Sequence, residues 1–585
     1  MLAASRSWRA GVALVLICLT VYLPGLFTIP PIDRDESRFA QASRQMFEAA
    51  AFKGSPQWRE DFHSGGWVVP HVQDRPRLNK PPLVYWLQVA SAWVFAGGDP
   101  LRDAIWMYRV PGVLCAIASV LLTWRMGLKM FDPRAAWLAS VFLAVCPVVV
   151  FDAHQARADQ LLLTLTIATM WALWEVWKAQ SSKQQSSDLE KSKRQRWSWV
   201  LFWVFLGLSI LAKGPITPMI AALTCVAISL ATQSWQWMWK LRPLVGLLIV
   251  AVIVGPWVYA VGAHVGWEQY LAIIKDETIG RSMEAKEGHW GPPGYHTVLL
   301  AVLFWPGSLT TAMAVVNAWK RARGGGGWRG VWTGRHAELF LLAWIVPAWV
   351  VFELVGTKLP HYTLPMYPAI ALLSARTLLG LRVSSLKAVD RVGQWVWAAI
   401  AVVISTMTCF ALMSLNGGHL PSRPSTVISV PAFIGIVMAC VVLVDSIRTV
   451  DVRNAQIAGV VLSVPLSLVL FGLYAPLQWD RLWMSNRIMD RILQVDETSL
   501  RPIAAVGYQE DSLIFLSRGR ARRITEDQIE EWLKSNPASL IVIDSSAFEK
   551  RSDLRLPQGH SVRPVHGFNY ARGRSESVIV AEMVK

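Results

Sequence analysis

Long apolar segments are the feature that most constrains this chain, because each is close to the twenty or so residues that a helix needs to cross a bilayer. About thirteen such segments occur, at 10–28, 105–124, 135–151, 161–177, 198–212, 215–232, 243–263, 296–317, 337–353, 365–381, 394–414, 428–445 and 455–475. Apolar residues make up 53% of the 585 residues and charged residues only 17%, too few to cover a water-soluble surface. The sequence therefore predicts a polytopic α-helical membrane protein. It excludes a chain of soluble domains, a disordered chain and a disulfide scaffold.

The distribution of Lys and Arg predicts the orientation of these spans. We treat the first segment as a membrane helix with a cytoplasmic N-terminus, and the apolar stretch 83–97 as an interfacial helix. The cytoplasmic loops then all carry Lys or Arg, at 125–134, 178–197, 233–242, 318–336, 382–393 and 446–454. Cytoplasmic loops of membrane proteins are enriched in these residues. The net charge of +17 is therefore attributed to topology and not to nucleic-acid binding.

The composition changes at about residue 476, where charged residues return and apolar runs shorten. We therefore divide the chain into a transmembrane domain at 1–475 and a soluble α/β domain at 476–585. Expected strands lie at 503–508, 513–516, 540–543 and 578–580, and a helix capped by Thr525 at 525–533. An odd number of spans places this C-terminal domain outside the cytoplasm.

Charged residues gather in the segments predicted to lie outside the cytoplasm. The largest, 29–104, begins with Asp33, Asp35 and Glu36 beside Arg34 and Arg38. Residues 36–48 can form a helix, with Asp35 as its N-cap. Taken alone, this cluster fits a charged loop with a helix-capping Asp as well as it fits a site. The functional interpretation is a carboxylate at the bilayer boundary, beside a guanidinium, placed to accept a proton next to an anionic lipid head group.

The other outer segments carry similar clusters, each of which fits ordinary interfacial residues when taken alone. The residues that we select from them are Arg75 and Lys80 in 29–104, Arg157 and Asp159 in 152–160, Arg281 and His289 in 264–295, and Lys358, His361 and Tyr362 in 354–364. Because these clusters lie on one side of a single bundle, we predict that they meet in one polar cavity open to the outer face.

Several motifs resemble those of a known superfamily. The stretch DESRFAQASRQMFE is similar to the D-E-x-R-[YF]-A-x-x-x-R-x-M signature of the bacterial aminoarabinose transferase and protein mannosyltransferase superfamily. NKPPLVYWL, ARADQLL, KLPHYTLPMYPAIALL and YQEDSLIFLSRGR resemble further segments of these proteins, in the same order. The resemblance spans about residues 10–520. It implies a GT-C membrane glycosyltransferase that uses a polyprenyl-phosphate sugar donor.

The resemblance also implies roles for individual residues. Asp35 matches the proposed catalytic carboxylate, and Asp159 the second Asp of the family. Positions that would bind the donor or acceptor are Arg38, Lys80, Lys358 and Tyr362, with Arg281 and His289 aligned loosely; Glu36, Arg75, Arg157 and His361 are added as their charged or polar neighbours. Aminoarabinose transferases carry a Glu linked to metal binding where this chain has Asn79. A divalent metal and the aminoarabinose specificity are therefore open.

The predicted function is the transfer of a sugar from a polyprenyl-phosphate donor to a lipid or glycan acceptor, such as a lipid A-like molecule, with inversion at the anomeric carbon. Protein O-mannosyl transfer is the alternative within the same class. A polytopic transporter and a non-catalytic membrane scaffold are alternatives from other classes. A transporter would place its charges in mid-span and usually carries inverted repeats, whereas the charges here lie at the ends of loops.

Overall fold

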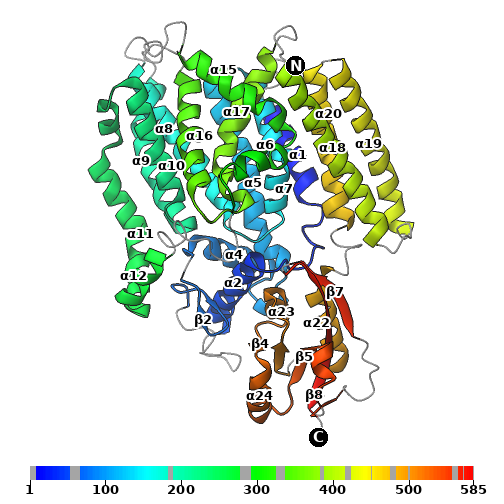
Figure 1. The fold of residues 1–585 in the computed structure, drawn as a ribbon. Helices are drawn as coiled ribbons and strands as arrows, with labels where there is room; N and C mark the ends of the chain where they lie inside the picture. Colours follow the sequence, from blue (N-terminus) through cyan, green and yellow to red (C-terminus); the bar gives the residue numbers. More distant parts are fainter. Residues whose placement is uncertain are drawn as a thin grey trace.

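The computed structural model describes residues 8–52, 66–78, 80–181, 189–276, 291–323, 336–381, 388–415, 423–449, 451–474, 482–497, 501–551, 553–555, 564–570 and 572–583. A helical bundle lies at one end, and the C-terminal part at the other (Figure 1). The bundle contains α1 (Trp8–Tyr22), α5 (Ile105–Met130), α6 (Pro133–Val145), α7 (Pro147–Ala153), α8 (Asp159–Ser181), α9 (Leu189–Lys213), α10 (Ile216–Thr232), α11 (Pro243–Val265), α14 (Tyr295–Leu303), α15 (Thr311–Arg323), α16 (His336–Leu354), α17 (Tyr367–Gly380), α18 (Ala388–Leu415), α19 (Arg423–Arg448) and α20 (Val452–Ser467).

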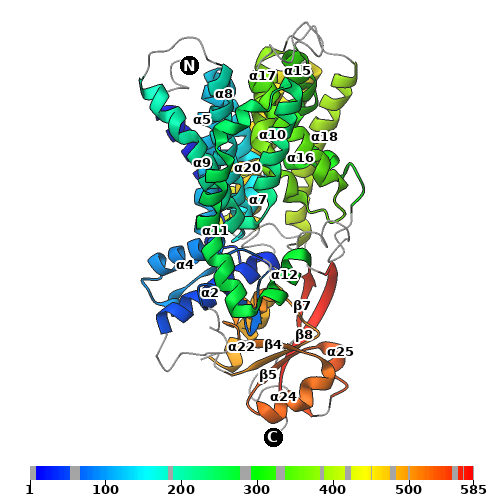
Figure 2. The same cartoon turned by 90° about the vertical axis from the view of Figure 1, so that its left-hand side faces the viewer.

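Shorter elements lie at the ends of this bundle. They are α2 (Asp35–Phe52), the antiparallel pair β1 (His71–Val72) and β2 (Arg75–Pro76), α4 (Leu83–Phe95), η2 (Pro100–Arg102), η3 (Gln236–Leu241), α12 (Trp267–Lys275), η6 (Gly307–Thr310), η8 (Pro360–Met366) and η10 (Leu468–Tyr474). Figure 2 shows α2 and α4 between the bundle and the C-terminal sheet. The expected helix over 36–48 is α2, and the expected interfacial helix over 83–97 is α4.

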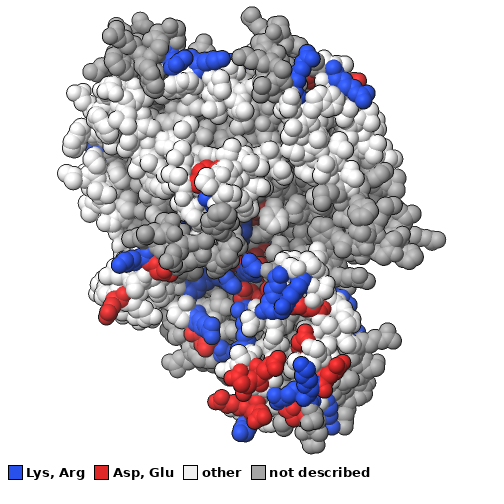
Figure 3. Space-filling model, in the orientation of Figure 1, with Lys and Arg blue, Asp and Glu red and all other residues white. Residues whose placement is uncertain are grey.

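Within the described residues, four helices are long and apolar enough to cross a membrane by themselves, or five if the bent pair α6–α7 is one span. The number thirteen therefore stays a prediction. Helix α11 shows why this bundle belongs in lipid: its most apolar window has a mean hydropathy of 2.5, and only 17% of that window is buried. A helix that is apolar all round and faces outward needs an apolar solvent. On the face of the bundle that Figure 3 shows, most of the described surface between the two ends carries no Lys, Arg, Asp or Glu.

Two expected spans are interrupted, and the sequence analysis was wrong to treat them as continuous. The segment 135–151 bends by 57° between α6 and α7, where Pro147 begins the second helix. The segment 296–317 is divided into α14, η6 and α15 around Pro306. Proline lacks the N–H that would continue the helical hydrogen bonds, so it ends or bends a helix. The residues on both sides of such a proline are equally apolar, so hydropathy alone does not detect the interruption of the helix.

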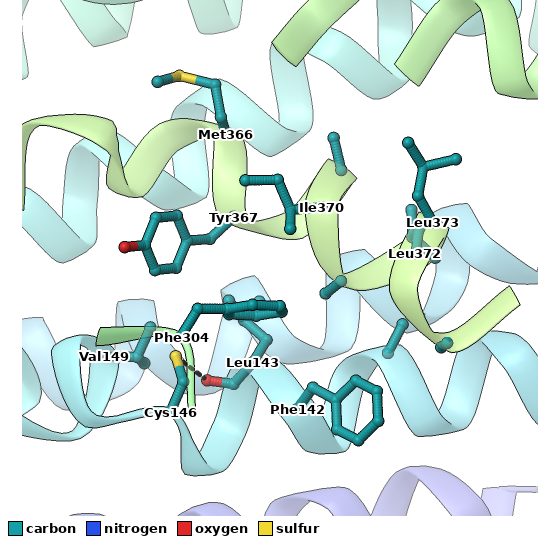
Figure 4. Packing of buried hydrophobic residues seen from close by; sticks show 14 of the residues in the cluster. Phe142, Leu143, Cys146, Val149, Phe304, Met366, Tyr367, Ile370, Leu372 and Leu373 are labelled. Atoms are coloured by element: carbon teal, nitrogen blue, oxygen red, sulfur yellow. Dashed lines mark hydrogen bonds between the residues drawn. The ribbon is translucent and has the colours of Figure 1, made fainter. Parts of the chain in front are cut away.

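Side chains from the bent pair, the end of α14 and the start of α17 pack in one buried apolar cluster. Phe304 meets Tyr367 edge to face at a ring separation of 5.3 Å, and the thiol of Cys146 donates to the carbonyl of Leu143 at 3.3 Å (Figure 4). All four residues are buried. Since η8 leads directly into α17, this core also holds residues 360–366 beside the loop that joins α7 to α8.

The C-terminal part consists of α22 (Met484–Val495), β3 (Ile503–Val506), α23 (Asp511–Leu516), β4 (Ala521–Ile524), η12 (Glu526–Gln528), α24 (Ile529–Ser535), β5 (Leu540–Asp544), α25 (Ser545–Phe548), β6 (Leu554–Arg555), β7 (Val565–Asn569) and β8 (Arg574–Met583). The sheet order is β4-β3-β5-β8-β6, with β7 also paired to β8. Strands β3, β4 and β5 are parallel, whereas β8 runs antiparallel to β5. Buried apolar side chains cover both faces of the sheet.

One expected strand in this region is a helix. Residues 513–516 belong to α23, and the reason is that a short buried apolar run has no periodicity that separates a strand from a helix. The helix packs between the sheet and α2. Thr525 is a helix cap as expected. It forms a capping box with Gln528, although the α-helix itself begins at Ile529.

A buried network of charges attaches α23 to α2 and its neighbour η2. The Arg44 Nε lies 2.6 Å from one oxygen of Asp103, and the Arg518 Nη1 lies 2.8 Å from the other. The guanidinium of Arg44 also donates to the carbonyl of Phe515 and lies 3.6 Å from the centre of its ring. The sheet is therefore held at a fixed place relative to α2.

Candidate active site

The first site element is the start of α2, where two adjacent carboxylates have different partners. Glu36 is fully buried and accepts from the Arg109 Nε at 2.7 Å and Nη2 at 2.9 Å, and from the Ala156 amide at 2.8 Å. The side chain of Asp35 is 44% exposed. Successive helical residues point about 100° apart, so Glu36 anchors the helix while Asp35 faces open space.

Cations surround Asp35. The Arg77 Nη2 lies 3.6 Å from its Oδ1. Desolvation raises the pKa of Asp35, but the nearby charges of Arg77, Arg157, Lys80 and Lys213 outweigh it, and the net shift is downward. Asp35 is therefore ionised at neutral pH, with a cluster of positive charges next to it.

The second carboxylate, Asp159, begins α8 and lies among three partners. The Lys213 ammonium contacts its Oδ1, the Arg157 Nε lies 3.8 Å from its Oδ2, and the His361 Nε2 lies 3.6 Å from Oδ1. Burial lowers the pKa of His361 to about 3, so this imidazole is neutral. Arg157 also pairs with Asp152. Residues from α7, α8, α9 and η8 thus meet at one point.

These groups line one cavity of about 1690 Å³ between the bundle and the C-terminal sheet. Its wall has three parts. Charged groups come from 33–38, 75–80, 152–159, 213 and 361; a polar wall comes from 522–536; and apolar side chains from the bundle include Phe151, Val302, Leu303, Trp305, Ile404, Leu466, Leu470 and Phe471. The cavity can therefore hold a molecule with a charged part and an apolar part.

The predicted site residues that line this cavity are Asp35, Glu36, Arg38, Arg75, Lys80, Arg157, Asp159, His361 and Tyr362. The carboxylate of Glu36 is turned away into its pair with Arg109. Lys358 is not in the lining; it is buried, and its ammonium donates to the Val355 carbonyl at 2.8 Å. Arg281, His289 and Asn79 lie outside the described residues. The roles of all these residues stay predictions.

Arg38 connects the first loop to the C-terminal part. Its Nε lies 2.8 Å from the Asp511 Oδ2, and Arg523 pairs with the other oxygen of that carboxylate. Nearby, the Ser512 amide donates to the Asp33 Oδ1 at 2.9 Å. Arg38 is therefore at the edge of the cavity but already shared with α23.

Sequence reasoning missed two residues that organise this site. Lys213 ends an apolar run and precedes Gly214 and Pro215, so its position is typical of a residue at the end of a membrane span. Arg109 lies inside the expected span 105–124, and an ionisable residue inside a span is a signal that could have singled it out. No group of three or more His, Cys, Asp or Glu side chains suited to a metal occurs among the residues with described positions.

Comparison with known proteins agrees with this geometry. Residues 79–259 match the family described as dolichyl-phosphate-mannose-protein mannosyltransferase. Two relatives named undecaprenyl phosphate-alpha-4-amino-4-deoxy-L-arabinose arabinosyl transferase, from Edwardsiella ictaluri and Erwinia tasmaniensis, are 25% and 27% identical over 63% of this chain. The matches span 58% and 60% of those relatives, so the chain covers less than two thirds of their length.

The structure of ArnT from Cupriavidus metallidurans bound to undecaprenyl phosphate superposes with a TM-score of 0.69, at 19% identity and over 97% of both chains. This likeness shows the fold, and the chain has the GT-C fold. The fold extends more distantly to the archaeal oligosaccharyltransferase AglB from Archaeoglobus fulgidus, with a TM-score of 0.51 over 92% of this chain. Residues of the motifs quoted above line the cavity, among them Asp35, Lys80 and Asp159.

Proposed function

We propose that this protein is a membrane glycosyltransferase that moves a sugar from a polyprenyl-phosphate donor to a lipid or glycan acceptor. One observation carries the proposal: an ionised, accessible carboxylate, Asp35, lies among cations in a cavity whose other wall is apolar. A lipid-linked sugar phosphate has the same three parts, namely an apolar tail, an anionic joint and a polar head.

The donor is placed by these parts. Its tail packs against the apolar wall, which includes Leu303, Leu466 and Phe471. Its phosphate lies among the cations that lower the pKa of Asp35, of which Lys80 and Lys213 are primary ammonium groups. Cations fixed where negative charge develops stabilise a departing phosphate without reorganising during the reaction.

The reaction is a direct displacement. An acceptor hydroxyl oxygen attacks the anomeric carbon, the bond from that carbon to the phosphate oxygen breaks, and the polyprenyl phosphate departs with the bonding electrons. Asp35 accepts the hydroxyl proton as the new glycosidic bond forms. Attack opposite to the leaving group inverts the anomeric configuration. Asp159 holds Lys213 and Arg157 in place.

The proposed topology has thirteen spans, a cytoplasmic N-terminus and a periplasmic C-terminal domain in the bacterial inner membrane. Lys and Arg gather at the end of the bundle away from the C-terminal sheet (Figure 3), in support of this orientation. The cavity would then open on the periplasmic side. A divalent metal stays a prediction, and Asn79 argues against it because aminoarabinose transferases carry a Glu linked to metal binding at this position.

A second candidate is transfer to a periplasmic protein. The match of residues 79–259 to the protein mannosyltransferase family favours it. The two candidates share the donor and the chemistry at Asp35, and differ in the acceptor. A transporter or a scaffold would need neither an ionised base nor its surrounding cations.

The test compares the lipids, glycans and periplasmic proteins of cells with and without this protein, by mass spectrometry. A glycolipid that carries one additional sugar only when the protein is present supports the proposal, and the Asp35→Asn variant must lose that product. A labelled periplasmic protein instead identifies the second candidate. Identical profiles in both strains, with the protein present in the membrane, would overturn the proposed activity.

A further inference from the structure

The C-terminal sheet contributes one wall of the cavity. The proposed reaction steps assign no role to the residues of this wall. It comes from the end of β4, from η12 and from α24, and its polar members include Arg522, Gln528, Trp532, Ser535 and Asn536. In Figure 1, β4 and α24 lie on the far side of α2 from the bundle. This wall therefore faces the cavity from the side opposite to the apolar wall of the bundle.

The size of the cavity leaves room for a second substrate at this wall. Its volume is about 1690 Å³. Sites for one small ligand usually have about 300–1,000 Å³. A donor head group at Lys80 and Asp35 therefore does not fill the space, part of which is lined by residues 522–536 of the C-terminal part.

The direction of attack assigns that space to the acceptor. In a displacement with inversion, the acceptor oxygen approaches the anomeric carbon from the side opposite to the leaving phosphate. The donor tail and phosphate occupy the side of the bundle. The acceptor must therefore enter from the side of Asp35 that faces the C-terminal wall.

The side chains of this wall suit the hydroxyl groups and flat faces of a saccharide. The indole of Trp532 is half-buried, and its Nε1 donates to the Ser539 hydroxyl at 3.1 Å, so the ring is held in place. Asn536 donates from Nδ2 to the Trp532 carbonyl at 3.2 Å, which leaves its amide oxygen as an acceptor. Gln528 is fixed by its capping contact with Thr525 at 3.1 Å. A ring and two amides held in this way lose little freedom on binding.

The guanidinium groups of the wall are each already paired with a carboxylate. The Arg522 Nη1 lies 2.7 Å from the Asp74 Oδ1, and Arg523 pairs with Asp511. A paired guanidinium still offers N–H groups to hydroxyls, but its charge is partly neutralised. This favours a hydroxyl-rich saccharide over a bare phosphate as the ligand.

We propose that the β4–α24 wall of the C-terminal domain is the acceptor subsite, and that it binds the saccharide head of the acceptor against Trp532. The inference rests on the proposed glycosyl transfer. The network of Arg44, Asp103 and Arg518 keeps this wall at a fixed place relative to α2, and hence to Asp35. The C-terminal domain thus determines which acceptor the site accepts.

The test uses the purified full chain with envelope lipids extracted from cells that lack it, as a mixture that holds donor and acceptor. Product is quantified while the glycolipid fraction is varied, and undecaprenyl phosphate binding is measured separately. Trp532→Ala removes the ring, and Ser535→Trp fills the space from an exposed position without removing a packed side chain. We expect both to raise the acceptor concentration for half-maximal rate by about tenfold, with unchanged affinity for undecaprenyl phosphate.

Two control variants make the result specific. Lys534 is exposed on the same helix and outside the cavity lining, so Lys534→Ala should match the wild type. Trp532→Phe keeps an aromatic ring, so its acceptor concentration for half-maximal rate should be close to that of the wild type. The inference is overturned if Ser535→Trp leaves the acceptor dependence unchanged, or if both wall variants weaken undecaprenyl phosphate binding in parallel. No product from the wild type would instead remove the proposed activity, and this inference with it.

Discussion

Glu36 and Arg109 form a two-point ion pair, at 2.7 and 2.9 Å, with both side chains fully buried. Arg109 also donates to the carbonyls of Leu26, Ile29 and Pro30. One guanidinium thus joins the turns that follow α1 to the start of α2. The orientation of the neighbouring Asp35 depends on this pair.

Breaking that pair should destabilise the protein. Glu36→Gln leaves the guanidinium buried without its counter-charge, at a cost of about 3–5 kcal/mol. We expect a lower unfolding temperature in detergent and a fall in transfer activity. Replacing both residues by Leu should recover much of the stability but not the activity. Arg102→Ala, which affects an exposed pair with Asp99, is the control and should change little.

Asp35→Asn should fold and bind donor but lose transfer, by about 10²–10⁴-fold for a missing general base. Binding of undecaprenyl phosphate should be equal or tighter, because the variant removes a negative charge beside the phosphate. Calorimetry and a product assay measure the two effects. Asp445→Asn, at an exposed position on α19, is the matched control. Wild-type turnover by the Asp35 variant would remove this residue as the base.

Lys213 and Asp159 should act as a unit, because their side chains are in direct contact. Lys213→Ala should weaken undecaprenyl phosphate binding by about tenfold. Without the Lys213 ammonium, less of the negative charge of Asp159 is neutralised, and Asp159 repels the phosphate more strongly. In an Asp159→Asn background, Lys213→Ala should reduce the affinity for undecaprenyl phosphate by a smaller factor. A double-mutant cycle on the binding constants measures this coupling. Strict additivity of the two variants would contradict the assigned contact.

The docking of the C-terminal part should depend on pH through Asp33. Burial raises the pKa of Asp33 from 3.8 to about 6, so the folded state holds a proton that the unfolded chain releases. Stability should therefore fall as the pH rises from about 4 to 6, and stay level above that range. Asp33→Asn should remove this dependence and be no less stable at pH 7. Hydrogen exchange near Ser512, over pH 4.5–8, is the measurement.

The matched control for that experiment is Glu530→Gln, at an exposed position on α24. It should leave the pH profile of exchange near Ser512 as it is in the wild type. A profile that keeps its slope in Asp33→Asn would show that another group is responsible.

Local patterns were sufficient for much of this protein. Hydropathy, capping residues and helix-breaking residues predicted the interfacial helix α4, helix α2 and three of the four expected strands. The strand expected at 513–516 is a helix, because a buried apolar run of four residues has no distinguishing period. Spans 135–151 and 296–317 are broken at prolines that apolar composition conceals.

Hydropathy, charge placement and motifs were enough to show that the chain belongs in lipid, that its charged clusters lie at segment ends, and that its motifs resemble one superfamily. How these clusters are used depends on the packing of the whole fold. It turned Glu36 into an anchor for Arg109, brought Lys213 to Asp159 across 54 residues, and closed the cavity with the C-terminal sheet. The physical reason is that hydropathy acts on each segment separately, whereas the partner of a charge depends on which helices pack together.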